Sequence, residues 1–193
     1  MTVPLPSQMM LEAAEGHAKR AVRLRKQLPN QTERVKWTMP GHELRFSNEK
    51  LLYDCLQDSM AAVLLGHTAL DNFLNEAIPA DFEWTDDKGQ VVGRQQIEGH
   101  WGLEKKLDLI LPRVTGKESV QTGLPETWAR CQDIKALRDL IGHTHYEATY
   151  TGPHDDPESS LYSRLLACDL EVLVQVADDV RDCYVATRST EQK

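Results

Sequence analysis

Apolar residues recur at steps of three and four along most of the chain, which is the periodicity of amphipathic helices. The first such stripe runs from about Ser7 to Leu28 and ends at a Pro-Asn pair. A second, longer stripe covers about Leu51 to Ile78 and ends at Pro79. Small side chains in this second segment would let neighbouring helices approach closely: Ala61, Ala62, Gly66 and Ala69. The pattern predicts a long central helix, about 42 Å in length, preceded by a shorter one.

The rest of the chain continues this pattern after one irregular insertion. Residues 82–94 hold two short β-prone runs around Asp-Asp-Lys-Gly, which predicts a β-hairpin or a long surface loop. Three further helices are expected, ending in turn at Pro112, at Gly142 and near the C-terminus: residues 97–111, 125–142 and about 158–186. The sequence thus predicts an all-α, up-and-down bundle of about five helices. No repeat or linker divides the chain, so we expect a single domain over 1–193. Its N-terminal helix and connector would lie in 1–46 and its core in about 50–187.

Composition and charge narrow the function classes. The longest unbroken apolar run is Met60 to Leu65, far short of the roughly 20 residues that span a bilayer, so we expect no membrane partner. Four widely spaced cysteines without a C-x-x-C pair favour reduced thiols and a cytoplasmic location. The net charge of −8 argues against a general nucleic-acid binder. However, residues 1–50 hold nine Lys and Arg against five Asp and Glu, so a local basic surface stays open.

One constellation with chemical potential lies at the end of the fourth predicted helix. Arg138 precedes His143 by five residues, and Gly142 lies between them. On an unbroken helix the two side chains would point about 140° apart. A helix that stops at Gly142 instead leaves His143 able to turn toward Arg138. Arginine supplies a fixed charge for phosphate and histidine moves protons near neutral pH, so the pair suits a phosphodiester site.

The segment Arg138-Asp139-x-x-x-His143 resembles the R-[N/D/H]-x-x-x-H motif of the HEPN superfamily, and the long second helix resembles the core helix of those domains. The resemblance implies an all-α domain, usually dimeric, which in active members is an endoribonuclease that needs neither metal nor cofactor. Arg138 would then stabilise the transition state, and His143 would activate the 2′-OH or protonate the leaving oxygen. Asp139 would support Arg138. His145, where one subgroup of toxins carries tyrosine, would be an additional phosphate contact or a loop histidine without a role.

A basic stripe is expected on the first helix. Lys19, Arg23 and Lys26 follow one another at helical spacing beside the apolar stripe. Such a stripe would contact the phosphates of RNA, which attract charge rather than base-specific groups. It would equally serve as a solvated face that keeps the helix soluble.

A metal site is the alternative interpretation of the late histidines. His143, His145 and His154 lie near acidic residues, and such a cluster can bind a divalent ion. No third ligand stands at a recognisable spacing, so we expect no metal.

Three functions therefore stay open. The first is an RNA-cleaving homodimer in a bacterial toxin–antitoxin or phage-defence setting, with a cognate antitoxin or a defence-system protein as partner. The second is a non-catalytic helical module of the same superfamily, used for oligomerisation or for binding a partner or nucleotide. The third is a small metal-dependent hydrolase that uses the late histidines.

Overall fold

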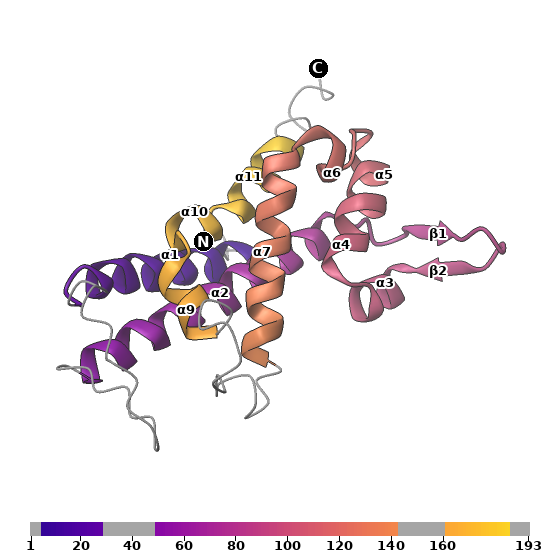
Figure 1. The fold of residues 1–193 in the computed structure, drawn as a ribbon. Coiled ribbons are helices and arrows are strands. Elements are labelled where there is room, and N and C mark those ends of the chain that lie inside the picture. Colours follow the sequence, from indigo (N-terminus) through magenta and orange to yellow (C-terminus); the bar gives the residue numbers. More distant parts are fainter. Residues whose placement is uncertain (1–4, 29–48, 143–160, 186–193) are drawn as a thin grey trace, which may run out of the picture.

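The computed structural model describes residues 5–28, 49–142 and 161–185. Helices account for most of these residues, and one two-stranded antiparallel sheet interrupts them (Figure 1). The all-α prediction is therefore confirmed. The elements with the longest periodic stripes were also predicted close to their observed bounds: α1 (Pro6–Arg25), α2 (Glu49–Ala77) and α7 (Pro125–Gly142).

Helices α1 and α2 form an antiparallel pair. Near the start of α1, the backbone N–H of Ser7 donates to Glu76 Oε1 at 3.0 Å, close to the end of α2. Further along α1, His17 Nδ1 lies 2.6 Å from Asp58 Oδ1, in the first half of α2. The face that α1 buries is made largely of small side chains, which allow the two helices to approach closely: Leu11, Ala14, Ala18 and Ala21. Helix α1 thus belongs to the main core.

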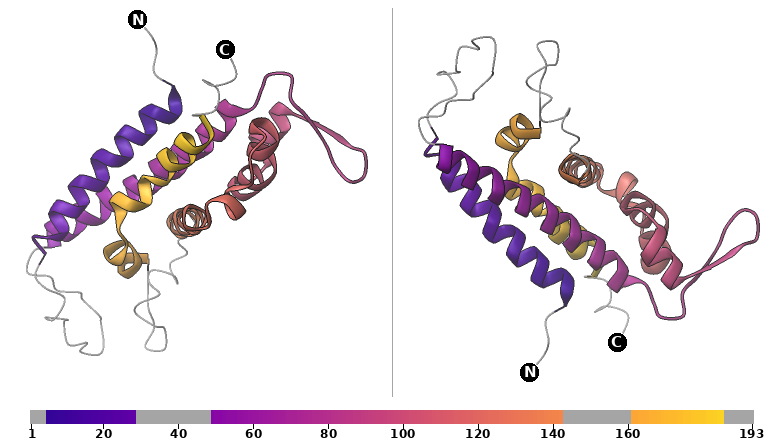
Figure 2. Two further views of the ribbon diagram at one scale, coloured as in Figure 1. Left: turned by 90° about the horizontal axis from the view of Figure 1, so that it is seen from above. Right: turned by 90° about the horizontal axis from the view of Figure 1, so that it is seen from below.

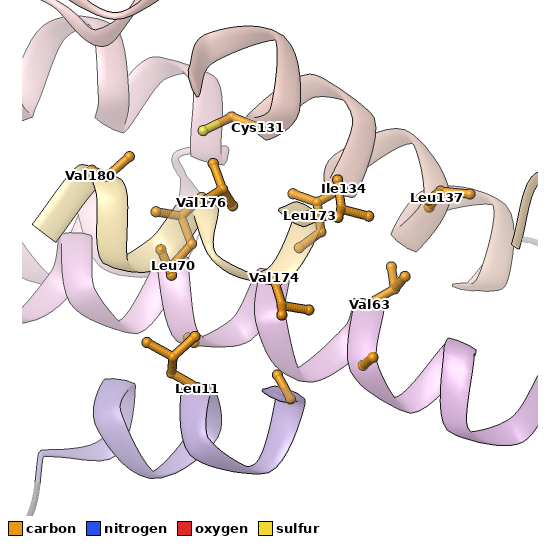
Figure 3. Close-up of a cluster of buried hydrophobic side chains, with 14 of the residues drawn as sticks. Leu11, Val63, Leu70, Cys131, Ile134, Leu137, Leu173, Val174, Val176 and Val180 are labelled. Atoms are coloured by element: carbon orange, nitrogen blue, oxygen red, sulfur yellow. The ribbon is translucent and has the colours of Figure 1, made fainter. Parts of the chain in front are cut away.

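Helix α2 runs through the middle of the fold. Figure 2 shows α1 along one side of α2 and α7 on the other, and α10 packs against both α1 and α2. In Figure 3, Leu11 of α1 lies on one side of Leu70 and Val63 of α2, and the side chains of α7, α10 and α11 cover the opposite side. The close approach expected at Gly66 is observed: a Cβ built there would lie 3.0 Å from Ile134 Cδ1. Helix α7 therefore crosses α2 where α2 has no side chain.

The insertion after α2 is a β-hairpin rather than a loop. Strand β1 (Glu83–Thr85) pairs with β2 (Val91–Gly93), and the hairpin projects from the bundle (Figure 1). Asp86 closes its turn by accepting from the backbone N–H groups of Lys88 and Gln90. A second, smaller core lies at its base, made of Ile78, Ile97 and Ile110.

The prediction of one helix over 97–111, ending at Pro112, is wrong. Trp101 and Gly102 are extended and break the segment, since Trp101 turns to pack edge-on against Trp84 with ring centroids 5.9 Å apart. The chain continues past Pro112, which lacks an N–H but occupies a first turn where helices tolerate proline. It stops at Gly116, whose φ of 71° is left-handed. The observed elements are α3 (Arg94–His100), α4 (Leu103–Lys105), a π-helical turn η2 (Lys106–Ile110) and α5 (Leu111–Thr115).

The prediction of one final helix over 158–186 is also wrong within the described residues. Arg25 donates to the carbonyls of Leu165 and Cys168 at 2.8 and 2.7 Å, which satisfies the last carbonyls before a break. Asp169 then begins a new helix, because its carboxylate accepts from the backbone N–H of Val172. The observed elements are α9 (Leu161–Ala167), α10 (Leu170–Val174) and α11 (Val176–Val185); a short helix before α7, α6 (Val120–Gly123), was not predicted.

Candidate active site

Helix α7 carries the arginine of the predicted pair. It begins at Pro125, and its buried face packs on α2 and on the C-terminal helices through Cys131, Ile134 and Leu137. Arg138 follows Leu137 and lies about one turn before Gly142, the last residue of the helix. His143 and His145 lie outside the described residues. Their positions relative to Arg138 therefore stay predictions.

The Arg138 side chain is 40% exposed and is held by the next residue along the chain. Its Nη1 donates to Asp139 Oδ1 at 2.8 Å. The other carboxylate oxygen of Asp139, Oδ2, lies 3.5 Å from Lys135 Nζ, one helical turn earlier. Lys135 Nζ is in turn 3.3 Å from Glu104 Oε1 of α4. Two cations and two carboxylates thus alternate across the surface between α7 and α4.

This network acts on the pKa of Lys135. The hydrogen bond that Lys135 donates to Glu104 and the negative charge of that carboxylate raise the pKa of Lys135, so the lysine stays cationic. Asp139 accepts a hydrogen bond from Arg138 Nη1 and forms an ion pair with Lys135, while Nε and Nη2 of Arg138 have no hydrogen bond to any described residue. These N–H groups can donate to a phosphate oxygen, for which the planar guanidinium is well suited.

His67 of α2 is a buried residue on which the charges of this network act, and the sequence did not indicate this relationship. It is buried, with an exposed fraction of 7%, and its Nε2 has no hydrogen-bond partner among the described residues. Burial, and then the positive charge of Arg138, lower the pKa of His67; Asp71 and Asp139 act in the opposite direction. Leaving a buried polar atom unpaired costs about 1–3 kcal/mol. The available signal was a titratable residue within an otherwise apolar stripe.

Thiol chemistry is disfavoured in the core. All four cysteines are free. Burial raises the pKa of Cys131 to about 12, and it also raises the pKa of Cys55 and Cys168. Because the thiolate is the reactive form, these side chains pack as apolar groups.

The basic stripe on α1 is exposed as expected. Lys19 pairs with Glu15 at 3.2 Å, whereas Arg23 and Lys26 form no ion pair with a described residue. Nearby, Arg20 pairs with Asp58 at 3.1 Å, and the Arg25 guanidinium donates to the carbonyls of Leu165 and Cys168. The positive charge available on this helix is therefore that of Arg23 and Lys26, with Lys19 partly neutralised.

Two hollows in the surface lie away from Arg138. One, of about 430 Å³, lies between α1, the end of α2, α5 and α11, and another, of about 650 Å³, lies beside the start of α3. Neither is lined by Arg138, Asp139 or Lys135. Arg138 therefore belongs to neither hollow.

The late histidines of the alternative metal site, His143, His145 and His154, lie outside the described ranges. Within residues 5–28, 49–142 and 161–185, no group of three His, Cys, Asp or Glu side chains is arranged to hold a metal ion. None of the described helices is long and apolar enough to cross a membrane. No protein-family model, curated protein or solved structure matches the chain.

Proposed function

We propose that the protein is a metal-independent endoribonuclease of the HEPN type. The observation that carries this proposal is Arg138 near the end of α7, held by Asp139 on one side of its guanidinium, with its remaining N–H groups unbonded to any described residue. In the sequence, His143 follows the last residue of that helix directly. A charge donor and a proton carrier are therefore five residues apart in the sequence.

In the proposed reaction, a ribose 2′-OH attacks the adjacent phosphorus and displaces the 5′-oxygen of the next nucleotide. His143 takes the 2′-OH proton or gives a proton to the leaving oxygen. Arg138 donates to the non-bridging oxygens as negative charge grows on them, which is work that a metal ion performs in other nucleases. The products are a 2′,3′-cyclic phosphate and a 5′-hydroxyl.

The remaining charged residues have supporting roles in this proposal. Asp139 positions Arg138 through the 2.8 Å hydrogen bond. His145 is an additional phosphate contact, and Lys19, Arg23 and Lys26 hold the RNA backbone at a distance from the reacting group. The setting we propose is cytoplasmic, in bacterial toxin–antitoxin or phage defence, with a cognate protein partner.

A symmetric homodimer completes the proposal, because one Arg–His pair supplies too few groups for acid, base and charge stabilisation together. An isologous twofold contact places the same patch on both subunits, so two motifs can face each other. The partly exposed side chain of Arg138 is compatible with a contact to a second copy. Light scattering tests this; a stable monomer at micromolar concentration would contradict it.

The decisive assay compares wild type with Arg138→Ala and His143→Ala on total RNA and on a defined single-stranded oligonucleotide, each with and without EDTA. We expect losses on the order of 10²–10³ for Arg138→Ala and about 10²–10⁴ for His143→Ala, with no effect of EDTA. Matched controls are Arg113→Ala and His100→Ala, which change exposed side chains away from the site.

Three outcomes would overturn parts of this proposal. If the two site variants cleave RNA as well as wild type does, Arg138 and His143 are not catalytic residues. Inhibition by EDTA would exclude the metal-independent mechanism. A wild-type dimer that cleaves nothing would instead favour a non-catalytic module of the same superfamily, used for oligomerisation or for binding a partner.

A further inference from the structure

Three buried side-chain atoms of the described residues have no hydrogen-bond partner: Arg25 Nε, His67 Nε2 and Asp178 Oδ1. Arg25 and Asp178 are only partly buried; Arg25 donates through its other nitrogens, and Asp178 forms an ion pair with Arg181. Among the polar side chains that are buried as a whole, His67 is the exception. The others each have a hydrogen-bond partner: Ser7 with Glu76, Ser59 with the Cys55 carbonyl, Lys106 with Asp71 and Asn75, and Thr127 with Arg130. His67 Nε2 has none. A buried polar atom left unpaired in a folded protein calls for an explanation, which is often a functional one.

The packing of α2 against α7 holds His67 in place. At the neighbouring Gly66, a Cβ would come within 3.0 Å of Ile134 Cδ1 and 3.2 Å of Val174 Cγ1. The two helices therefore meet without a gap, and the position of His67 on α2 is fixed by that contact. Lys135 and Arg138 follow Ile134 by one and four residues on α7, and the positive charges of both act on the imidazole of His67.

The charges that act on His67 come from two helices. From α7 they are Arg138, Lys135 and Asp139, and from α2 it is Asp71. Asp71 is engaged by Lys106 Nζ at 2.9 Å, and Asp139 by Arg138. Both carboxylates are thus already paired with cations. In the absence of a further anion, burial and Arg138 keep the imidazole neutral.

We propose that His67 is a positioning residue that couples anion binding at Arg138 to the uptake of one proton. When a phosphodiester occupies the unbonded N–H groups of Arg138, its negative charge offsets the guanidinium. A proton from solvent then binds the ring nitrogen that lacks one, and the imidazolium attracts the anion. This inference rests on the proposed function only in taking Arg138 as the phosphate-binding residue.

The test measures the imidazole itself. A His143→Ala/His145→Ala background removes the two histidines nearest to Arg138 in the sequence. Imidazole ¹H–¹⁵N correlation spectra then follow His67 between about pH 5 and pH 8. The probe is a 2′-O-methyl oligouridine, whose phosphodiesters do not titrate in this range and which cannot be cut by 2′-OH attack. We expect the probe to raise the pKa of His67. Arg138→Ala should raise the pKa of His67 in the absence of the probe. In this variant, addition of the probe should cause no further rise in that pKa.

Binding of the same probe gives the second readout. Each unit by which the probe raises the pKa corresponds to a tenfold gain in affinity on acidification through the titration. His67→Gln keeps an amide near Nε2 but cannot take a proton, and His67→Phe fills the space without a polar atom. Both variants should bind the probe with less pH dependence, while His100→Gln, on an exposed histidine, should behave as wild type.

Two outcomes would overturn the inference: a probe that binds without moving the pKa of His67, or an unchanged pKa in Arg138→Ala. Neither readout depends on cleavage. A protein that shows the coupling but cuts no RNA would refute the proposed nuclease and keep the inference, whereas cleavage without coupling would do the reverse.

Discussion

The Arg138 guanidinium lies against the carboxylate of the residue that follows it, with Nη1 2.8 Å from Asp139 Oδ1. Consecutive residues on a helix do not normally face each other, so the long arginine side chain must fold back to make this contact. The carboxylate both orients the guanidinium and competes with any anion that approaches it. The competition weakens anion binding, whereas the orientation of the guanidinium favours catalysis.

Asp139→Asn separates the two effects. The amide keeps an acceptor for Arg138 but removes a negative charge, so we expect a 2′-O-methyl oligonucleotide to bind about threefold to fivefold more tightly, the size of a surface charge interaction of up to about 1 kcal/mol. Cleavage of the unmodified oligonucleotide should slow, because the guanidinium is held less firmly. Fluorescence anisotropy and single-turnover cleavage measure the two quantities. The control is Asp133→Asn, an exposed acid on the same helix; weaker binding by Asp139→Asn would contradict this account.

Arg23 and Lys26 test whether α1 contacts RNA. If each neutralises one phosphate, Arg23→Ala/Lys26→Ala should lower the slope of log affinity against log salt by about 1.4 for single-stranded RNA. The matched control, Lys88→Ala/Arg113→Ala, removes two exposed cations from the hairpin and from α5. Equal slopes in the two double variants would instead make the stripe on α1 a solvated face.

The buried ammonium of Lys106 predicts a large effect on stability. It is 1% exposed and is held by Asp71 Oδ1 at 2.9 Å and Asn75 Oδ1 at 2.8 Å. Asp71→Ala leaves that charge buried without a counterion, which should lower the free energy of unfolding by about 3 kcal/mol. Asp54→Ala, which breaks an exposed pair with Lys50, should cost less than about 1 kcal/mol.

Urea unfolding measures both changes. Lys106→Met in the Asp71→Ala background should recover stability, because an apolar side chain of similar length needs no counterion. Equal losses for Asp71→Ala and Asp54→Ala would show that the Lys106 charge is solvated in the folded protein.

Long amphipathic stripes allowed α1, α2 and α7 to be predicted, because each buries one continuous face. The breaks in the later helices were missed because tertiary contacts make them: Arg25 of α1 satisfies the carbonyls before the Cys168 break, and Trp101 turns to reach Trp84. Neither contact is local in sequence. A local helical pattern therefore extends through both breaks.

The candidate site likewise has a part that the sequence could indicate and a part that depends on tertiary packing. Arg138 and Asp139 are adjacent in sequence, so a motif could indicate them. His67 is about 70 residues away along the chain and joins them only through the crossing of α2 and α7. In the sequence it occupies a position of the apolar stripe, where a histidine is most simply interpreted as part of the core.

Gly66 and Gly16 predict opposite effects of the same substitution. Gly16 lies within α1 with nothing within 4 Å of a built Cβ, so Gly16→Ala should raise the free energy of unfolding by up to about 1 kcal/mol through helix propensity. At Gly66 the Cβ would lie 3.0 Å from Ile134 Cδ1, and crowding of a packed core costs about 1–3 kcal/mol. Gly66→Ala should therefore be destabilising overall.

Ile134→Val removes the crowding atom and provides the second half of this test. In a double-mutant cycle by urea unfolding, Gly66→Ala and Ile134→Val should be coupled favourably by about 1 kcal/mol. Additive effects would mean that α7 can shift away from α2 at no cost.

The pH dependence of stability follows from the buried imidazole. The folded state lowers the pKa of His67 below its ordinary value of 6.5, through burial first and Arg138 second. Below pH 6.5 the unfolded chain therefore binds more protons at this position than the folded protein does. The contribution of neutral His67 to the free energy of unfolding should be complete above about pH 6.5. It should decrease as the pH falls toward the pKa of His67 in the folded state.

His67→Phe should not show the loss of stability on acidification that protonation of His67 causes, since phenylalanine fills a similar volume and takes no proton. Other groups titrate in the same range, so the informative quantity is the difference between wild type and variant, measured by urea unfolding at a series of pH values. We expect the variant to gain stability relative to wild type as the pH falls from about 7 to about 5, while His100→Gln, at an exposed histidine, follows wild type. A constant difference across this range would show that His67 has the same pKa in the folded and unfolded states.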